Sequence, residues 1–536
     1  MKPRITLALV FCANAALAAA AAQPVPDAGL RAEARGQWAE AVEIYQQALK
    51  ADPAQAQLWE RIADIHAVRL KQPDRAAAAL QEAVKHAPKD ARLYHKLSQA
   101  HAAAGEAPAA LAAVNRAVEL EPDNATYLRA RGEVAALAGD HALALDSLER
   151  VLARAPEDAV ARKQQARILA WTGRPRAALA VIAELEPAMR DDYELAHART
   201  VALAAAHRPR AALAGLAEVT RLRPDSKETT DLTRVIRTPL RSNVTFGSGY
   251  VTGSDDITIR HAGVRAEYAV NPETRLFGGG ERRRIGARAG SGYEKPDGGA
   301  AIGYDRAWLG IRHRAAPELA LDARAGTGTA EGDDRSIYEV GADYQPLDDL
   351  AVRLARRQDL HAVSPRAAKL GIERRADTLD ATWTPDPRWT LAGRFGSDAF
   401  SDGNHRREVV LAPRRAILRT QQLNHDLGVS GQWFGYDRDP GNGYYAPTRY
   451  ERYALTAFTY RKISDDDGVS IALGVGPYKD NTMSGFRTGG DIVAEGFFGI
   501  YRDWFLNVKA ALSDFGGGAA DGYHSRLIEI NLTRRF

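Results

Sequence analysis

The sequence predicts two parts, an α-helical repeat domain followed by an antiparallel transmembrane β-barrel of about sixteen strands, so the fold class is α + β. Three observations predict it. Pro88, Pro122 and Pro156 lie 34 residues apart, which indicates a repeat. At Thr238–Leu240 the apolar residues change from helical spacing to every second position. The last segment, Leu527–Phe536, alternates apolar and polar residues and ends on an aromatic, as the closing strand of a membrane barrel does.

Residues 1–22 have the composition of a secretory signal peptide. Lys2 and Arg4 precede an apolar stretch, and alanines then fit cleavage just before Gln23. The apolar stretch is shorter than the roughly 20 residues that a spanning helix needs. The only cysteine, Cys12, lies in this stretch, so we expect neither disulfides nor thiolate metal sites in the mature chain. A net charge of +4 gives no indication of nucleic-acid binding.

Residues 23–237 are predicted to form the helical repeats, in the periplasm. In each unit an alanine is followed by a large residue four positions on and a small or aliphatic one three later, which places all three on one helical face. The residues expected to pack the helices are Ala41, Tyr45, Ala48, Ala110, Ala117 and Ala144. The turns between paired helices are expected at Gly36, Gly105, Gly139 and Gly173, because glycine adopts the left-handed conformation that ends a helix.

This pattern resembles tetratricopeptide repeats over about 200 residues, with about five clear units and one degenerate unit. The resemblance implies a superhelix whose concave surface binds proteins. A spacer without a specific ligand is the alternative.

Residues 238–536 are predicted to form the barrel. Apolar residues occupy every second position in about sixteen segments, such as Trp504–Leu512, Ile492–Ile500 and Val264–Val270. Charged residues stand between them in mid-strand. A soluble sandwich turns its apolar face inward, whereas a membrane barrel turns it toward lipid and keeps charges in a wet lumen. The charges therefore favour an outer-membrane barrel, with a sandwich as the alternative.

The final strand is expected to close this barrel. Its apolar face consists of Ile528, Ile530, Leu532 and Phe536. Polar residues alternate with them. Arg534 falls on the apolar face, and we expect it at the periplasmic rim, where arginine reaches the lipid headgroups.

The lumen is expected to carry mixed charge, because the barrel half contains about 40 basic and about 39 acidic residues. Such a lumen suits a neutral or weakly charged polymer; the alternative is that the charges pair and hold the lumen closed. The candidates for lumen-facing glycan contacts are Glu267, Trp308, Asp322, Asp380, Phe434, Tyr436, Glu495, Asp503 and Glu529. Two long polar stretches, His361–Arg374 and Ser401–Asn424, are candidates for a plug.

A second resemblance lies just before the predicted strand Arg452–Lys462. The segment there carries the aromatic and proline positions Tyr444, Tyr445, Pro447 and Tyr450. It resembles the same stretch of outer-membrane exopolysaccharide export proteins, which include the poly-N-acetylglucosamine export porin and the cellulose-synthase outer-membrane subunit. With the signal peptide, the repeats and the barrel, the resemblance covers nearly the whole chain.

The resemblance implies an outer-membrane protein of biofilm formation that is not an enzyme. Its repeats recruit periplasmic proteins of a glycan synthesis or modification complex, and its barrel, surrounded by outer-membrane lipid, passes a polysaccharide outward. The tyrosines of the motif are expected in the aromatic belt at the membrane interface, with sugar stacking as the alternative.

Other motifs point to no cofactor and no metal. Gly441–Ala446 fits a dinucleotide-binding pattern by letter, but it lies between predicted strands, so we expect a loop. Asp465–Asp467 is expected to be an exposed acidic turn. A non-conducting outer-membrane anchor or receptor is the main alternative to export. A glycosidase is a further one, because its paired carboxylates need no sequence signature.

Overall fold

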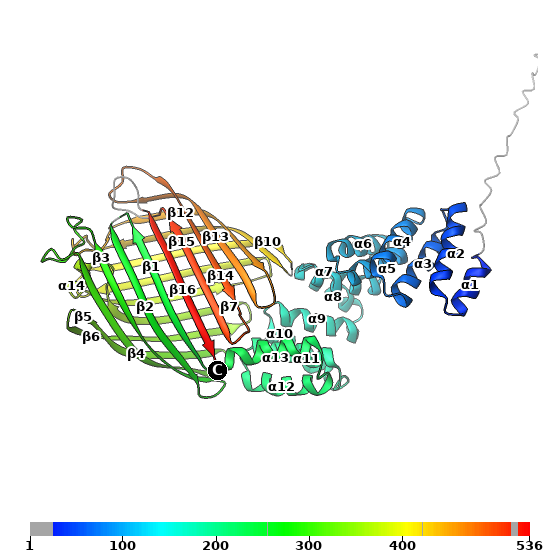
Figure 1. Cartoon of the computed structure of the whole chain (residues 1–536), viewed down its shortest axis with the longest axis horizontal. Coiled ribbons are helices and arrows are strands. Elements are labelled where there is room, and N and C mark those ends of the chain that lie inside the picture. Colours follow the sequence, from blue (N-terminus) through cyan, green and yellow to red (C-terminus); the bar gives the residue numbers. More distant parts are fainter. Residues whose placement is uncertain (1–24, 255, 421, 516–523) are drawn as a thin grey trace, which may run out of the picture. The chain divides into compact units, whose positions relative to one another are not determined.

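The chain forms two compact units, Met1–Val134 and Ala135–Phe536. The computed structural model describes residues 25–254, 256–420, 422–515 and 524–536. The predicted signal peptide, residues 1–22, lies outside these ranges. Helices fill the first part of the described chain and strands the second (Figure 1), so the predicted α + β class is confirmed.

Twelve helices of the described residues follow one another as six helix–turn–helix pairs in sequence, and a thirteenth follows them. Their bounds are α1 Asp27–Ala34, α2 Trp38–Ala51, α3 Ala56–Asp64, α4 Pro73–His86, α5 Ala91–Ala103, α6 Ala107–Leu120, α7 Ala125–Leu137, α8 His141–Arg154, α9 Ala159–Trp171, α10 Pro175–Leu185, α11 Tyr193–Ala205, α12 Pro209–Leu222 and α13 Lys227–Arg237. A π-helical turn, η1 Ile65–Arg69, continues α3, and a 3₁₀ turn, η2 Thr238–Leu240, follows α13. The helices therefore extend to the predicted boundary.

The first helices of the later pairs, and α13 after them, each begin at a residue whose side chain accepts a backbone N–H bond. These residues are Asp90, Asn124, Asp158, Asp192 and Ser226, each 34 residues after the one before. Such caps satisfy N–H groups that have no partner within the helix. The second helices of several pairs (α4, α6, α10 and α12) instead carry proline in their first turn, where its missing N–H costs nothing.

Left-handed residues separate the helices of each pair. Gly105, Gly139 and Gly173 have φ between 77° and 83°, as predicted, and Gly36 has φ of 75°. The two remaining units use non-glycine residues there: Lys71 at φ 55° and His207 at φ 57°.

The predicted packing positions form the helical core. Ala41, Tyr45, Ala110, Ala117 and Ala144 have no exposed surface, and Ala48 packs partly buried against the same core. Alanine at these positions lets neighbouring helices approach closely.

Sixteen antiparallel strands in the described residues close into a barrel, in which each strand pairs with its sequence neighbours and β1 pairs with β16. Their bounds are β1 Asn243–Gly253, β2 Ile257–Ala269, β3 Thr274–Ala287, β4 Ala301–Ala316, β5 Leu319–Ala330, β6 Asp333–Leu347, β7 Leu350–Leu360, β8 Glu373–Trp383, β9 Trp389–Phe400, β10 His405–Arg419, β11 Leu423–Tyr436, β12 Tyr450–Lys462, β13 Asp467–Asp480, β14 Arg487–Phe498, β15 Trp504–Ser513 and β16 Ser525–Arg535. The predicted barrel and its strand number are confirmed.

The two ends of the barrel differ. At one end, the short-turn end, no connection exceeds five residues, as in the turns around Pro272 and Pro385. The other end, the long-loop end, carries the connections 288–300, 361–372 and 437–449, and the first helix after the repeats, α14 (Pro365–Lys369), lies there (Figure 1).

The stretch Ser401–Asn424, a candidate for a plug, is not a long loop. Most of Ser401–Asn424 is strand β10, which is paired with β9 and β11. Its charged residues Arg406, Glu408 and Arg414 stand at alternate positions, so a run that looks polar is one face of a barrel strand. The stretch His361–Arg374 is mainly a loop and holds α14. No helix among the described residues is long and apolar enough to cross a bilayer.

Candidate functional site

The lumen of the barrel is the candidate functional site, because strand alternation separates an apolar outer face from a polar inner one. Leu309 and Leu455 point outward and are 77% and 68% exposed. The residues that alternate with such outward positions along each strand point inward. Asp322, Asp398 and Asp480 occupy inward positions and are buried. The outer face therefore suits lipid and the inner face holds charge.

The final strand follows this rule. Ile528, Ile530, Leu532 and Phe536 are exposed on the outer face. Arg534 shares that face, and its guanidinium lies 3.0 Å from Asp503 and 5.3 Å from the ring centroid of Trp504. The ion pair and the cation–π contact give an arginine at the short-turn end local partners.

Most of the lumen candidates lie on inward positions of the strands. They are Glu267 on β2, Trp308 on β4, Asp322 on β5, Asp380 on β8, Phe434 and Tyr436 on β11, Glu495 on β14 and Glu529 on β16. Asp503 does not lie within a strand: it stands in the turn before β15 and binds Arg241 and Arg534. Their contact with a glycan remains a prediction.

Several of these candidates are engaged by neighbouring side chains. Asp322 accepts a bond of 3.0 Å from Arg353, and Asp380 one of 2.6 Å from Arg394. The lumen therefore contains the cross-strand charge pairs that the sequence left as an alternative.

Aromatic rings fill the lumen at the long-loop end. This aromatic cluster consists of His361, Phe400, Phe434, Tyr436, Tyr444, Tyr450, Tyr478 and Phe515, joined by ring-centroid distances of 4.5 to 6.4 Å. Phe434 and Tyr450 stack at 4.5 Å, and Phe400 and Tyr444 at 5.3 Å. The rings come from strands β9, β11, β12 and β13 and from loops that fold onto them.

We expected the motif tyrosines in an interface belt, but the structure places them in this interior. Tyr444 and Tyr450 are only 5% and 4% exposed, and Tyr445 donates a 2.5 Å bond to the buried Asp480. Pro447 lies in the loop, where its carbonyl accepts from Tyr436 N–H at 2.9 Å. The sequence could not reveal this placement, because a loop that folds back has no periodicity.

Polar contacts hold loops 361–372 and 437–449 over the cluster. Asn404 Nδ2 donates to Tyr444 Oη (3.0 Å), which donates to Asp402 Oδ2 (2.9 Å). Ser364 Oγ donates to the Gly443 carbonyl, so the loop that holds α14 is bound to loop 437–449.

Two titratable groups in these loops are shifted by their surroundings. Burial, followed by the charges of Arg374 and Arg406, lowers the pKa of His361 to about 3. For Asp402, burial acts to raise the pKa, but hydrogen bonds from Asn442 and Tyr444 outweigh it and the pKa is lowered. The loops are therefore held by a neutral histidine and an ionised aspartate.

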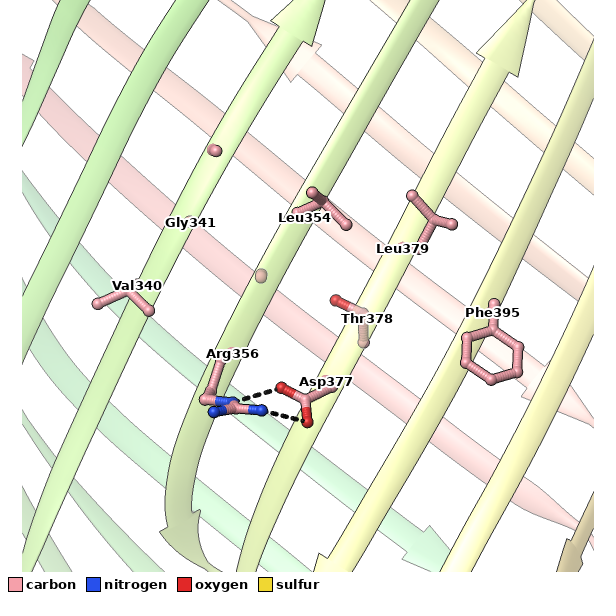
Figure 2. Close-up of a pocket in the computed structure, with 10 residues that line it drawn as sticks. Val340, Gly341, Leu354, Arg356, Asp377, Thr378, Leu379 and Phe395 are labelled. Atoms are coloured by element: carbon pink, nitrogen blue, oxygen red, sulfur yellow. Dashed lines mark hydrogen bonds and ion pairs between the residues drawn. The ribbon is translucent and has the colours of Figure 1, made fainter.

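A shallow depression of about 490 Å³ lies on the outer face over β6–β9 (Figure 2). Val340, Leu354, Leu379 and Phe395 surround it, and each is exposed. Figure 2 shows Arg356 and Asp377 bound by two hydrogen bonds of 2.6 and 2.9 Å beside it. Since the two charged side chains are paired with each other, we interpret the depression as part of the lipid-facing surface and not as a binding or catalytic site.

In the second unit, repeat helices are bound to the short turns of the barrel. Asp348, between β6 and β7, accepts the backbone N–H groups of Arg176 (2.9 Å) and Ala177 (3.2 Å) at the start of α10. Arg210, in α12, donates to both oxygens of Glu273 at 2.9 and 3.0 Å. A carboxylate at a helix N-terminus is favoured by free N–H groups and the helix dipole.

The first unit contains a groove of its own. A cavity of about 480 Å³ lies between α2, α3 and α4 and is lined by apolar and polar side chains that include Trp59, His66 and Glu82. Among the described residues, no three His, Cys, Asp or Glu side chains come together as a metal ion would require.

Comparison with known proteins identifies the repeats. Family models described as tetratricopeptide repeat match residues 27–91, 95–159 and 135–202. The chain thus carries tetratricopeptide repeats followed by a sixteen-strand barrel, the architecture that the resemblance to export porins implies. None of the curated proteins compared matches the chain.

Solved structures resemble parts of the chain at low identity. A bacterial polysaccharide outer membrane secretin is 15% identical with a TM-score of 0.47, over 55% of this chain and 99% of its own. The MamA protein is 22% identical with a TM-score of 0.28, over 30% of this chain and 87% of its own. A tetratricopeptide repeat protein from Parabacteroides merdae ATCC 43184 is 17% identical with a TM-score of 0.36, over 39% of this chain and 83% of its own.

Proposed function

We propose that this chain is an outer-membrane porin that exports a polysaccharide, and that its repeats recruit partner proteins in the periplasm. The observation that carries the proposal is the barrel wall. Its outer face is apolar, and its lumen is lined by ion pairs and aromatic rings. A soluble protein would leave such an outer face in water, whereas a bilayer covers it.

The unequal ends support one orientation. Outer-membrane barrels have short turns on the periplasmic side and long loops outside. The repeats of the second unit bind the short turns through contacts such as Asp348–Arg176 and Glu273–Arg210. In this orientation the repeats lie in the periplasm, where proteins that make or modify a glycan would meet them.

A polymer would pass the lumen through many weak contacts, since tight binding would stop transport. The inward carboxylates Glu267, Glu495 and Glu529 offer hydrogen-bond acceptors to sugar hydroxyls, and Trp308 offers a ring. The chain itself needs to catalyse no reaction in this process.

A second function, a non-conducting anchor or receptor, is favoured by one observation: the aromatic cluster and its two loops occupy the lumen at the long-loop end. Measurement of the current through single barrels in planar bilayers distinguishes the export porin from the anchor or receptor. We expect a low conductance for the full chain and a several-fold higher one when 439–446 are replaced by a Gly-Ser linker.

The matched control replaces 295–299 in the loop between β3 and β4 by the same kind of linker, because it leaves the Tyr293 carbonyl that binds Arg366 in place and the aromatic cluster contains no residue of that loop. Its conductance should stay low. A barrel that never conducts, even without residues 439–446, would favour the anchor.

A further inference from the structure

An arginine-lined cavity of about 270 Å³ opens into the lumen below the loop that begins at His361. Its charged lining consists of five arginines and one carboxylate: Arg283, Arg306, Arg324, Arg357, Arg374 and Asp359. The arginines come from strands β3, β4, β5, β7 and β8, so one wall of the barrel gathers them. The barrel half as a whole is nearly balanced in charge, and this cavity is therefore a local excess.

The carboxylates around this cavity are already shared between two or more donors. Glu281 lies 3.0 Å from Arg306 and also binds Arg283. Asp359 lies 2.9 Å from Arg306 and also accepts from Tyr304.

The next carboxylates along the wall are engaged in the same way. Glu339 lies 2.7 Å from Arg324 and 3.6 Å from Arg353. Asp398 lies 2.9 Å from Arg374 and 3.4 Å from Arg406. In the described part of the wall around this cavity, Glu281, Asp359, Glu339 and Asp398 are thus all bound to other side chains.

Arg357 is the guanidinium without a carboxylate. It faces Glu339 across the β6–β7 pair, yet among the described residues it makes no ion pair. The Nε–H groups of Arg306 and Arg374, both buried, also have no acceptor in the described parts of the chain. The cavity lining thus contains one guanidinium, that of Arg357, whose nearest carboxylates are all bound to other side chains.

We infer that this cavity binds a carboxylate of the transported polymer, so that the exported glycan is an acidic polysaccharide. The inference rests on the proposed export function. Guanidinium groups bind carboxylates through paired, charge-assisted hydrogen bonds, and clustered arginines are stabilised when an anion joins them. The volume is close to the lower limit of about 300 Å³ for small-molecule sites and suits one sugar unit. The sequence alone favoured a neutral or weakly charged polymer, because the total charge of the barrel half does not show that arginines gather on one part of its wall.

Calorimetric titration of the detergent-purified full chain tests the inference without requiring conduction. The acidic probe is trigalacturonate, and the neutral probe of equal length is maltotriose. We expect the chain to bind trigalacturonate at least tenfold more tightly. Arg357→Gln should weaken that binding roughly tenfold, which corresponds to about 1.4 kcal/mol, while Arg357→Lys should give an intermediate loss because it keeps the charge without the fork.

The matched control is Lys509→Gln, which removes an inward positive charge from β15 on another part of the wall, between Glu495 and Glu529 in register. It should leave trigalacturonate binding unchanged. Equal affinity for both probes, no binding of trigalacturonate, or equal losses in Arg357→Gln and Lys509→Gln would overturn the inference. Far-UV circular dichroism and heat-dependent gel mobility verify that each variant forms the barrel.

The outcome is separable from that of the export proposal. If a strain without this protein loses its surface glycan but the two probes bind equally, the export function is supported and the inference of an acidic polymer is refuted. If trigalacturonate binds selectively and the strain keeps its surface glycan, export falls instead.

Discussion

At the scale of single residues, the packing of loop 361–372 against the aromatic cluster depends on a histidine that must stay neutral. The ring of His361 stands edge-on to Phe400 and Tyr444, 5.0 Å from each ring centroid. Its pKa of about 3 lies below the ordinary value of 6.5, since burial and the nearby Arg374 and Arg406 disfavour the charged form. The loop contact is therefore fully stable above pH 6.5 and weakens as the pH falls toward 3.

Acidification should thus raise the conductance of the full chain. Each pH unit from 6.5 down to about 3 costs up to about 1.4 kcal/mol of loop docking, because the undocked His361 binds a proton that the buried ring does not. Between pH 6.5 and 4 the single-channel open fraction should increase, and His361→Phe should abolish the change. Asp402 does not contribute in this window, because its pKa is lowered from the ordinary 3.8. A variant that keeps the same pH response would contradict the role of His361.

The residue-scale predictions from sequence succeeded where a two-residue period applies. Glu267, Asp322 and Glu529 fall on the inward face because alternation assigns a side to every strand residue. The same rule, applied to arginines, would have found Arg306 and Arg357. It gave no information on Tyr444 or Asp402, whose positions depend on loops that fold back.

At the scale of elements, the 34-residue spacing extends over more of the chain than the three prolines Pro88, Pro122 and Pro156 indicated. The helix caps from Asp90 to Ser226 recur every 34 residues, and so does the left-handed position from Lys71 to His207. The last predicted unit was weak in sequence, yet α11 and α12 pack as the other pairs do, around Tyr193, Leu203 and Leu216. Packing therefore tolerates more variation than the sequence pattern does.

Lys71 offers a test of the left-handed position. Its φ of 55° is strained for a residue with a side chain, so Lys71→Gly should stabilise the helical unit by roughly 1 kcal/mol. The helical circular dichroism signal of the full chain during denaturant unfolding measures the change. As a control, Gly105→Lys, at φ 80°, should destabilise by a similar amount. Equal stability of all three chains would refute the argument.

The contact between α10 and the β6–β7 turn is a second element-scale test. Asp348→Ala removes the acceptor of the Arg176 and Ala177 N–H groups and should destabilise the docking by about 1 to 2 kcal/mol. Limited proteolysis between the repeats and the barrel should speed up accordingly. The control is Asp349→Ala, whose carboxylate contacts Trp383 instead. Similar cleavage rates for both variants would show that the cap is unimportant.

For the whole molecule, the sequence predicted the order of the parts and the strand number, because both follow from periodicity. The boundary at Thr238–Leu240 coincides with the 3₁₀ turn that joins α13 to the barrel. The stretch His361–Arg374 was a candidate for a plug, but the aromatic cluster that it joins and the arginine-lined cavity were not predicted, since each brings together residues from distant strands that share no local pattern.

The orientation of the whole chain is testable with single cysteines, because the only native cysteine, Cys12, precedes the expected cleavage site. A membrane-impermeant maleimide should label Asp439→Cys, in loop 437–449, on intact cells. Glu119→Cys, exposed on α6, should react only after the outer membrane is permeabilised. The reverse labelling pattern would place the repeats outside.

The central claim, export of a polysaccharide through the barrel, is tested most directly by measuring surface and periplasmic glycan in a strain that lacks this protein. We predict that surface glycan disappears while glycan accumulates in the periplasm, and that expression of the full chain restores export. Unchanged surface glycan in the deletion strain would contradict the claim.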